Sequence, residues 1–111
     1  MTSAPRSLQV ERRLSCRHPS LAGHFPGKPV FPGVVLLAEV MEVALDDPPS
    51  AVRLGDTPRV EAVKFMSPVL PTDQPDVVIV VVLKEAANGV DFEVHSGERV
   101  AVRGQLRCMK P

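Results

Sequence analysis

The feature that most constrains this sequence is an almost wholly apolar run over residues 34–45, which has the length of a helix. Pro32 and Gly33 open the run, and proline is favoured in a first helical turn because it has no amide hydrogen to leave unpaired. The polar side chains fall at spacings of three and four and form one narrow stripe, at Glu39, Glu42 and Asp46. Other parts of the chain must therefore wrap around this helix.

Most of the remaining chain alternates apolar and polar residues with the two-residue period of half-buried strands. The predicted strands cover residues 8–16, 59–66, 77–83, 90–95 and 100–107. Residues 77–83 are apolar throughout, which predicts a strand buried on both faces. Arg12 interrupts the apolar face of the first strand. Asn88 and Gly89 predict a tight hairpin, because both residues tolerate positive φ.

The segments between these elements complete the expected architecture. Residues 46–49 contain two aspartates and two prolines and are expected to end the helix, and residues 50–58 are expected to form a loop or a loose edge. One apolar helix followed by a run of antiparallel strands predicts an α+β fold. We expect residues 1–111 to form a single domain in which a curved antiparallel sheet wraps around one central helix.

Composition excludes several classes of function. Thirteen basic and thirteen acidic residues cancel, and there are four Phe and no Trp or Tyr, which argues against nucleic acid or an anionic membrane as a partner. The N-terminal residues lack the apolar core of a signal peptide, and no run reaches the roughly 18 apolar residues of a membrane span, so we expect a cytoplasmic protein. Cys16 and Cys108 lie far apart without metal-binding spacing and are interpreted as reduced thiols. No cofactor or metal is expected.

The loop before the helix carries the candidate chemistry. His24 lies between a glycine and a Phe-Pro pair, in a segment stiffened by prolines. Imidazole changes protonation near neutral pH, so His24 is a candidate base. The unpaired amides at the helix start, beginning with Gly33, favour developing negative charge. The sequence therefore places a base and an oxyanion site within a few residues of each other.

Three other cationic or titratable side chains are weaker candidates. His18 and His95 are interpreted as surface residues, because nothing in the sequence supplies them with a partner carboxylate or metal-ligand spacing. Lys28 lies close to His24 and would attract a phosphate group. A single exposed charge contributes little, so an ordinary loop lysine is the simpler interpretation.

Two segments resemble a known family. Residues 23–35, GHFPGKPVFPGVV, closely resemble the active-site segment of the FabA/FabZ-like 3-hydroxyacyl-(acyl carrier protein) dehydratases. Residues 63–73, VKFMSPVLPTD, resemble the strand that follows the helix in that family. The resemblance implies a hot-dog fold, two subunits joined edge to edge, and active sites at the interface between them.

The same resemblance implies an activity and a set of site residues. The family removes water from 3-hydroxyacyl thioesters, carried on acyl carrier protein or CoA, to give 2-enoyl thioesters in fatty acid, lipid or aryl-polyene type biosynthesis. His24 would remove the α-proton, with its ring held by the carbonyl of Val30, and the amide of Gly33 would polarise the thioester carbonyl. Substrate contacts would come from Phe25, Pro32 and Val34.

The chain departs from the family pattern at one position. The family carboxylate lies fourteen residues beyond the histidine, where this chain has Ala38. Alanine cannot donate a proton to the departing hydroxyl, and loss of such assistance typically costs about 10² to 10⁴ in rate. Glu39 is adjacent, but neighbouring helical residues point about 100° apart, and Glu39 belongs to the polar stripe. A second copy of this chain in a homodimer would not supply the acid, because it also has Ala38. A related subunit in a hetero-oligomer could supply it.

Two other functions fit the same fold. The chain could be a non-catalytic subunit that binds acyl chains or supports a partner dehydratase, in which case replacing His24 would leave the partner's activity and assembly unchanged. It could also be an acyl thioesterase, in which the histidine and the helix-end amides would serve hydrolysis and release a free thiol. Sequence alone leaves both alternatives open.

Overall fold

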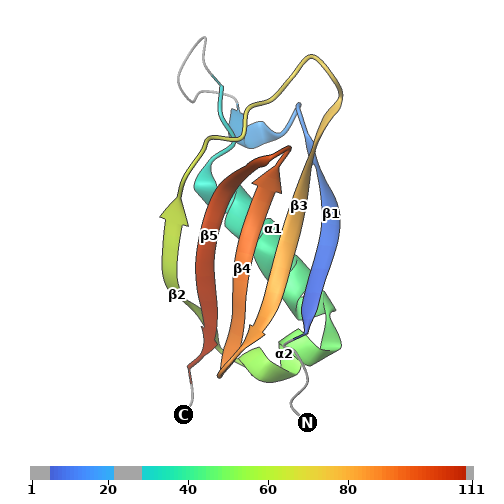
Figure 1. Cartoon of the computed structure of the whole chain (residues 1–111). Coiled ribbons are helices and arrows are strands. Elements are labelled where there is room, and N and C mark those ends of the chain that lie inside the picture. Colours follow the sequence, from blue (N-terminus) through green and yellow to red (C-terminus); the bar gives the residue numbers. More distant parts are fainter. Residues whose placement is uncertain (1–5, 22–28, 110–111) are drawn as a thin grey trace.

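The computed structural model describes residues 6–21 and 29–109, which form one antiparallel sheet and two α-helices (Figure 1). In chain order the elements are β1 (Ser7–Ser15), the short 3-10 helix η1 (Pro19–Leu21), α1 (Gly33–Asp46), α2 (Pro48–Leu54), β2 (Pro58–Phe65), β3 (Asp76–Ala86), β4 (Gly89–Ser96) and β5 (Arg99–Cys108). The strand order across the sheet is β1-β3-β4-β5-β2, and every neighbouring pair is antiparallel. The predicted α+β class is confirmed.

The core lies between α1 and one face of the sheet. Helix α1 contributes the buried side chains Leu36, Val40, Val43 and Ala44. The strands contribute every second residue, as the alternating sequence predicted, with Ile79, Val81, Leu83, Phe92, Val94, Val102 and Leu106 among the most deeply buried. Asn88 has φ 62, and the β3–β4 hairpin turns where Asn88 and Gly89 were expected to turn it.

One prediction about β3 is wrong. Ile79, Val81 and Leu83 are buried, but the neighbouring Val78 is 39% exposed. The strand is therefore half-buried, because α1 packs on only one face of this antiparallel sheet. The apolar sequence of β3 therefore does not mean that other elements pack on both faces of the strand.

The expected loop after α1 is also partly wrong, because residues 48–54 form the short helix α2. Asp47 begins this helix: its carboxylate accepts hydrogen bonds from the amide of Ser50 at 3.3 Å and from the Ser50 hydroxyl at 2.6 Å. Pro48 and Pro49 occupy the first turn, where no amide hydrogen is needed. The residues that end α1 therefore also start α2.

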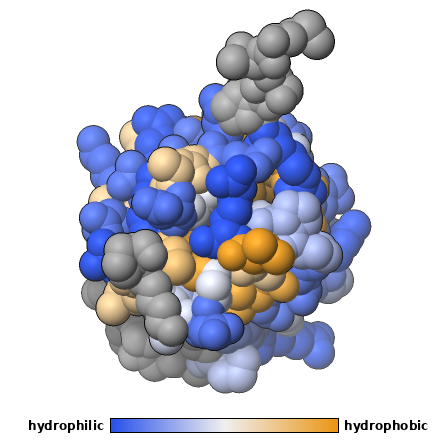
Figure 2. Space-filling model, turned by 90° about the horizontal axis from the view of Figure 1, so that it is seen from below, coloured by the Kyte–Doolittle hydropathy of each residue, from blue (hydrophilic) through white to orange (hydrophobic). Residues whose placement is uncertain are grey.

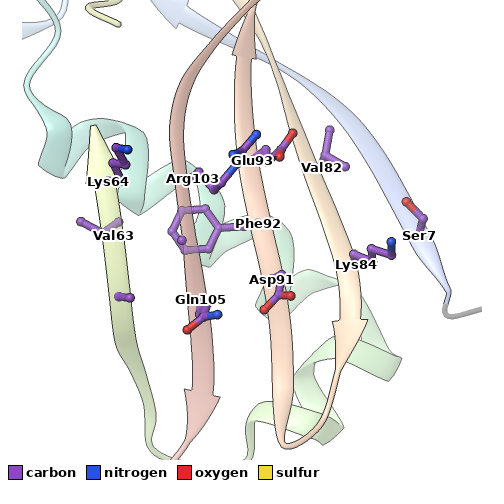
Figure 3. A pocket seen from close by; sticks show the side chains of 12 residues that line it. Ser7, Val63, Lys64, Val82, Lys84, Asp91, Phe92, Glu93, Arg103 and Gln105 are labelled. Carbon is purple, nitrogen blue, oxygen red and sulfur yellow. Dashed lines mark hydrogen bonds and ion pairs between the residues drawn. The ribbon is translucent and has the colours of Figure 1, made fainter. Parts of the chain in front are cut away.

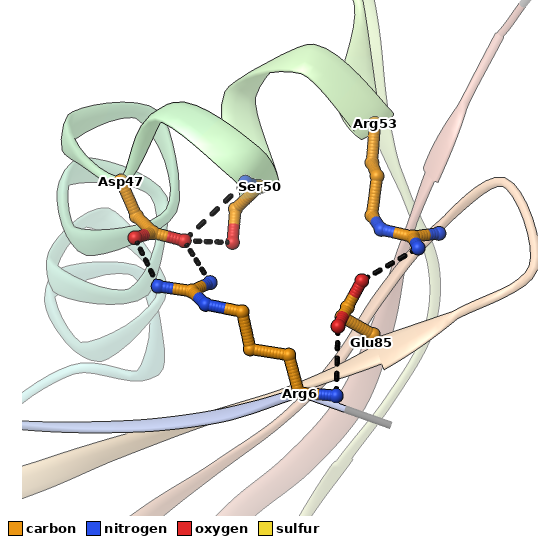
Figure 4. A network of polar contacts seen from close by, with 5 residues as sticks. All are labelled: Arg6, Asp47, Ser50, Arg53 and Glu85. Carbon is orange, nitrogen blue, oxygen red and sulfur yellow. Dashed lines mark hydrogen bonds and ion pairs between the residues drawn. The ribbon is translucent and has the colours of Figure 1, made fainter. Parts of the chain in front are cut away.

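Asp47 also connects α2 to the start of the sheet (Figure 4). The guanidinium of Arg6 donates to both carboxylate oxygens of Asp47, each at 2.7 Å. The backbone amide of Arg6 donates to Glu85 at the end of β3, and Arg53 of α2 forms an ion pair with the same carboxylate. These contacts tie β1, β3 and α2 together at one end of the molecule. Hydrogen bonds from Arg6 are the main reason that the pKa of Asp47 falls from 3.8 to about 2.

We expect Asp47→Ala to lower the free energy of unfolding at pH 7 by about 1 to 2 kcal/mol, because it removes a helix cap and an ion pair. A carboxyl whose pKa is depressed in the folded state stabilises it above the unfolded pKa and loses this effect as pH falls. The difference between wild type and variant should therefore shrink as pH falls from 3.8 towards about 2. Urea unfolding at several pH values measures this, with the exposed Asp56→Ala as control. Equal stability of Asp47→Ala and wild type at pH 7 would contradict the capping role.

The end of the molecule that carries α2 has a mixed surface (Figure 2). Val52 of α2 is 81% exposed and Leu45 at the end of α1 is 46% exposed, among hydrophilic side chains. Apolar side chains scattered in this way are common on protein surfaces and do not indicate a ligand site. No helix within the described ranges is long and apolar enough to cross a membrane.

Candidate active site

The start of α1 presents backbone donors without a side-chain cap. Pro32 occupies the N-cap in an extended conformation, with φ −60 and ψ 147, and no side-chain hydrogen bond caps the helix. The amide of Val35 bonds to the Pro32 carbonyl at 3.0 Å, which leaves Gly33 and Val34 as the first-turn donors. The unpaired amides and the helix dipole both favour negative charge at this end.

A groove of about 580 Å³ lies beside this helix start. We call it the α1-end groove; it is lined by Phe31, Gly33, Val34, Leu36, Phe65, Met66, Ser67, Pro68 and Val69. Its two walls are the start of α1 and the segment that follows β2, and Figure 1 shows β2 ending beside the start of α1. Exposed apolar side chains gather here, with Val34 71% and Phe65 54% exposed. The groove therefore suits an apolar chain with a polar group at the helix end.

Backbone hydrogen bonds fix both walls of the groove. The amide of Phe31 donates to the Val69 carbonyl at 3.0 Å, which joins the segment before α1 to the segment after β2. The amides of Met66 and Ser67 both donate to the carbonyl of Ala101 on β5, at 2.8 and 3.2 Å. The helix start is thus held against the edge of the sheet.

Phe65 lies directly against Gly33. A Cβ atom on Gly33 would lie 2.3 Å from Cε1 and 2.6 Å from Cζ of the Phe65 ring. Only glycine therefore fits at the first position of α1 while Phe65 keeps this place. The sequence did not reveal this contact, because it joins residues far apart in the chain.

The structure locates only part of the predicted site. Gly33 and Val34 line the α1-end groove and Pro32 directly precedes them, so these three lie together at the helix start. Val30 lies in the segment that leads into α1. The predicted base His24, the predicted substrate contact Phe25 and the loop residue Lys28 lie outside the described residues.

Ala38 and Glu39 differ sharply in their surroundings. Ala38 is exposed on α1. The Glu39 carboxylate accepts a hydrogen bond from Nε of Arg12 at 2.8 Å, and its side chain is only 17% exposed. Arg12 also lies 3.5 Å from Glu42, so the arginine that interrupts the apolar face of β1 covers the polar stripe of α1. Glu39 does not line the α1-end groove.

The hydrogen bond to Glu39 is the main cause that raises the pKa of Arg12. An arginine that stays charged keeps Glu39 directed toward β1. In the described structure Glu39 is therefore directed away from the α1-end groove.

The interpretation of His95 as a histidine without a carboxylate partner is wrong. Its Nε2 lies 2.7 Å from Oε1 of Glu93, and this contact is the main cause that lowers the pKa of Glu93. The two residues are two positions apart on β4 and so share a face of the sheet, which the strand period should have indicated. His18 lies between β1 and η1. Within the described ranges, no group of three His, Cys, Asp or Glu side chains could hold a metal ion.

Comparison with known proteins agrees with this geometry. Residues 1–105 match the family model "ApeI-like: ApeI dehydratase". The chain is 38% identical over 114 residues to a 3-hydroxyacyl-(acyl-carrier-protein) dehydratase FabZ of Vibrio atlanticus, covering 95% of this chain and 75% of that protein. It is 27% identical over 111 residues to the FabZ of Verminephrobacter eiseniae, covering 91% of this chain and 73% of that protein.

Solved structures share the fold. A pyran synthase domain from module nine of the sorangicin pathway superimposes with a TM-score of 0.71 at 25% identity, covering 100% of this chain and 38% of that chain. The dehydratase heterocomplex ApeI:P from Xenorhabdus doucetiae gives a TM-score of 0.69 at 22% identity, covering 91% of this chain and 85% of that chain. These neighbours confirm the hot-dog fold, and the FabZ relatives confirm the resemblance seen in the sequence. The chain belongs to the ApeI-like dehydratase family.

Proposed function

We propose that this chain provides the base and the oxyanion site of a dehydratase that acts on 3-hydroxyacyl thioesters, carried on acyl carrier protein or CoA. The observation that carries the proposal is the uncapped start of α1, which opens at Gly33 onto an apolar groove. The FabZ relatives are named for this reaction on acyl carrier protein substrates. Fatty acid, lipid or aryl-polyene type biosynthesis would use such a product.

The proposed reaction assigns each proton. The amide of Gly33 donates to the thioester carbonyl oxygen and stabilises the negative charge that develops there. His24 takes the α-proton, the bond between C3 and the hydroxyl oxygen breaks, and an acid protonates the departing hydroxyl to release water. The acyl chain lies along the α1-end groove, with its thioester end beside Pro32 and Val34, and Phe25, the neighbour of His24 in the sequence, provides a further contact.

The acid must come from another group, because Ala38 cannot supply it. We infer that a related hot-dog subunit provides a carboxylate to His24 of this chain, in a hetero-oligomer. β2 is an edge strand with exposed apolar side chains at Val60 and Phe65, so a second sheet could pair along it. The neighbour ApeI:P is, by its title, a dehydratase heterocomplex. A homodimer of this chain would carry alanine at both acid positions.

Incubation with a 3-hydroxydecanoyl thioester distinguishes the possible functions, with the enoyl product and the free thiol measured separately. We expect enoyl product from the complex of this chain with its co-purified subunit, and little product from the chain alone. The complex should form almost no product when this chain carries His24→Ala. Free thiol without enoyl product would instead show a thioesterase. Full activity of the complex with His24→Ala would show a non-catalytic subunit.

A further inference from the structure

One side chain that lines the α1-end groove carries a hydroxyl group. The described residues along the groove are all glycine, proline or apolar, except Ser67. Ser67 is half-buried, and its hydroxyl forms no hydrogen bond with any group of residues 6–21 or 29–109. The hydroxyl therefore remains able to donate to, or accept from, a ligand in the groove.

Contacts on either side of Ser67 place it beside the start of α1. The Phe65 ring lies against Gly33, and the Phe31 amide donates to the Val69 carbonyl at 3.0 Å. Ser67 lies between Phe65 and Val69 in the chain, so it lies alongside the residues that lead into the helix. Its own amide donates to β5 at 3.2 Å, which fixes the backbone at this point. Ser67 is therefore near the end of the groove where the first amides of α1 are exposed.

A second hollow lies on the face of the sheet opposite to α1, and we call it the outer hollow. Its volume is about 520 Å³, and charged side chains of β4 and β5 line it (Figure 3). Asp91 accepts a hydrogen bond from Arg107 at 2.8 Å, and Glu93 accepts from Arg103 at 3.0 Å. An acyl chain in the outer hollow would remove these ion pairs from water, which is unfavourable. The α1-end groove is therefore the better place for an acyl chain.

A 3-hydroxyacyl chain brings one polar group into the groove besides its thioester. This step rests on the proposed function, in which the Gly33 amide binds the thioester carbonyl oxygen. The 3-hydroxyl lies two carbons further along the chain, so it enters the groove close to the start of α1. A hydroxyl that leaves water for apolar surroundings without a hydrogen bond is unfavourable. Among the described lining residues, Ser67 has the side chain that can provide this bond.

We propose that the Ser67 hydroxyl forms a hydrogen bond with the 3-hydroxyl group of the substrate. This contact makes the groove selective for 3-hydroxyacyl thioesters over acyl thioesters that have no hydroxyl. It also fixes the direction in which the departing hydroxyl points toward the acid. The acid itself still comes from the second subunit, so Ser67 determines specificity and orientation.

Calorimetric titration of the folded chain alone with 3-hydroxydecanoyl-CoA and decanoyl-CoA tests the proposal, because the chain alone turns over little. The ratio of the two dissociation constants measures the preference for the 3-hydroxyl group. Ser67→Ala should reduce this preference by about three- to tenfold, the usual contribution of one neutral hydrogen bond. The affinity for decanoyl-CoA should hardly change. Ser67→Thr keeps a hydroxyl and should retain most of the preference.

Two results would overturn the proposal and leave the dehydratase function intact. Equal weakening of both ligands by Ser67→Ala would show a contact with the shared thioester arm, and unchanged affinities would show no contact. Ser7→Ala is the matched control and should change neither affinity, because Ser7 lines the outer hollow and not the α1-end groove. If neither thioester bound to the wild-type chain, the proposed function would be contradicted, and this inference with it.

Discussion

Replacing Ala38 with glutamate is expected to raise the rate of enoyl thioester formation by this chain alone by about 10² to 10⁴, the usual contribution of general acid assistance. The substitution places a carboxyl at an exposed position of α1, so it should not disturb the core. In a homodimer of the hot-dog type, each new carboxyl would face the His24 of the other subunit. Initial rates with a 3-hydroxydecanoyl thioester measure the gain.

Two matched variants control this experiment. Ala38→Gln has nearly the same size and no acidic proton, and should give no gain. Glu39→Gln removes the neighbouring carboxylate that Arg12 holds toward β1, and should leave turnover unchanged. A large loss with Glu39→Gln would show that Glu39 is the acid after all. No gain with Ala38→Glu, in a folded dimer, would contradict the assignment of Ala38 to the acid position.

Gly33→Ala is expected to lower turnover of the active complex by up to about 10² to 10³, the limit set by the cost of losing one oxyanion donor, because alanine keeps this amide and can only displace it. The new methyl group would lie 2.3 Å from Cε1 of Phe65, so either the ring or the first turn of α1 must move. Movement of the helix start displaces the amide that polarises the thioester carbonyl. Steady-state kinetics should show the loss mainly in kcat, because the donor acts most strongly on the charge that develops in the transition state.

The clash with Phe65 provides an internal check. Phe65→Ala removes the ring, so the double variant Gly33→Ala with Phe65→Ala should recover part of the activity that Gly33→Ala loses. Val34→Ala changes the next residue, whose side chain is 71% exposed, and should change kcat little. If Gly33→Ala moved the first turn of α1 and still retained full activity, the helix end would not be the oxyanion site.

Much of the fold follows from local pattern. The apolar run at residues 34–45 predicted α1, and alternation together with the Asn88-Gly89 pair predicted the strands and the hairpin. One error arose where residues have two roles, because Pro48 and Pro49 end α1 and also begin α2. The break that Arg12 makes in an apolar face was visible, but its cause was not, since its partners Glu39 and Glu42 lie on α1. Such roles depend on contacts that a local pattern does not contain.

The parts of the candidate site that depend on neighbouring residues in the chain were predictable from the sequence. The proline and glycine at the start of α1 indicated free amides, and in the structure Gly33 and Val34 open α1 after Pro32 without a side-chain cap. The absence of a carboxylate at Ala38 is visible in the sequence itself. The Phe65 ring against Gly33, and the two walls of the groove, were not predictable because they join segments distant in the chain.

The most direct measurement of the central claim is deuterium exchange at the α-carbon of a decanoyl thioester in D₂O, because this substrate has no 3-hydroxyl and needs no acid. If His24 and the amide of Gly33 together activate the α-proton, the wild-type chain should introduce deuterium at that carbon, and both His24→Ala and Gly33→Ala should lose the exchange. Exchange at the same rate in wild type and His24→Ala, or none in wild type, would contradict the account.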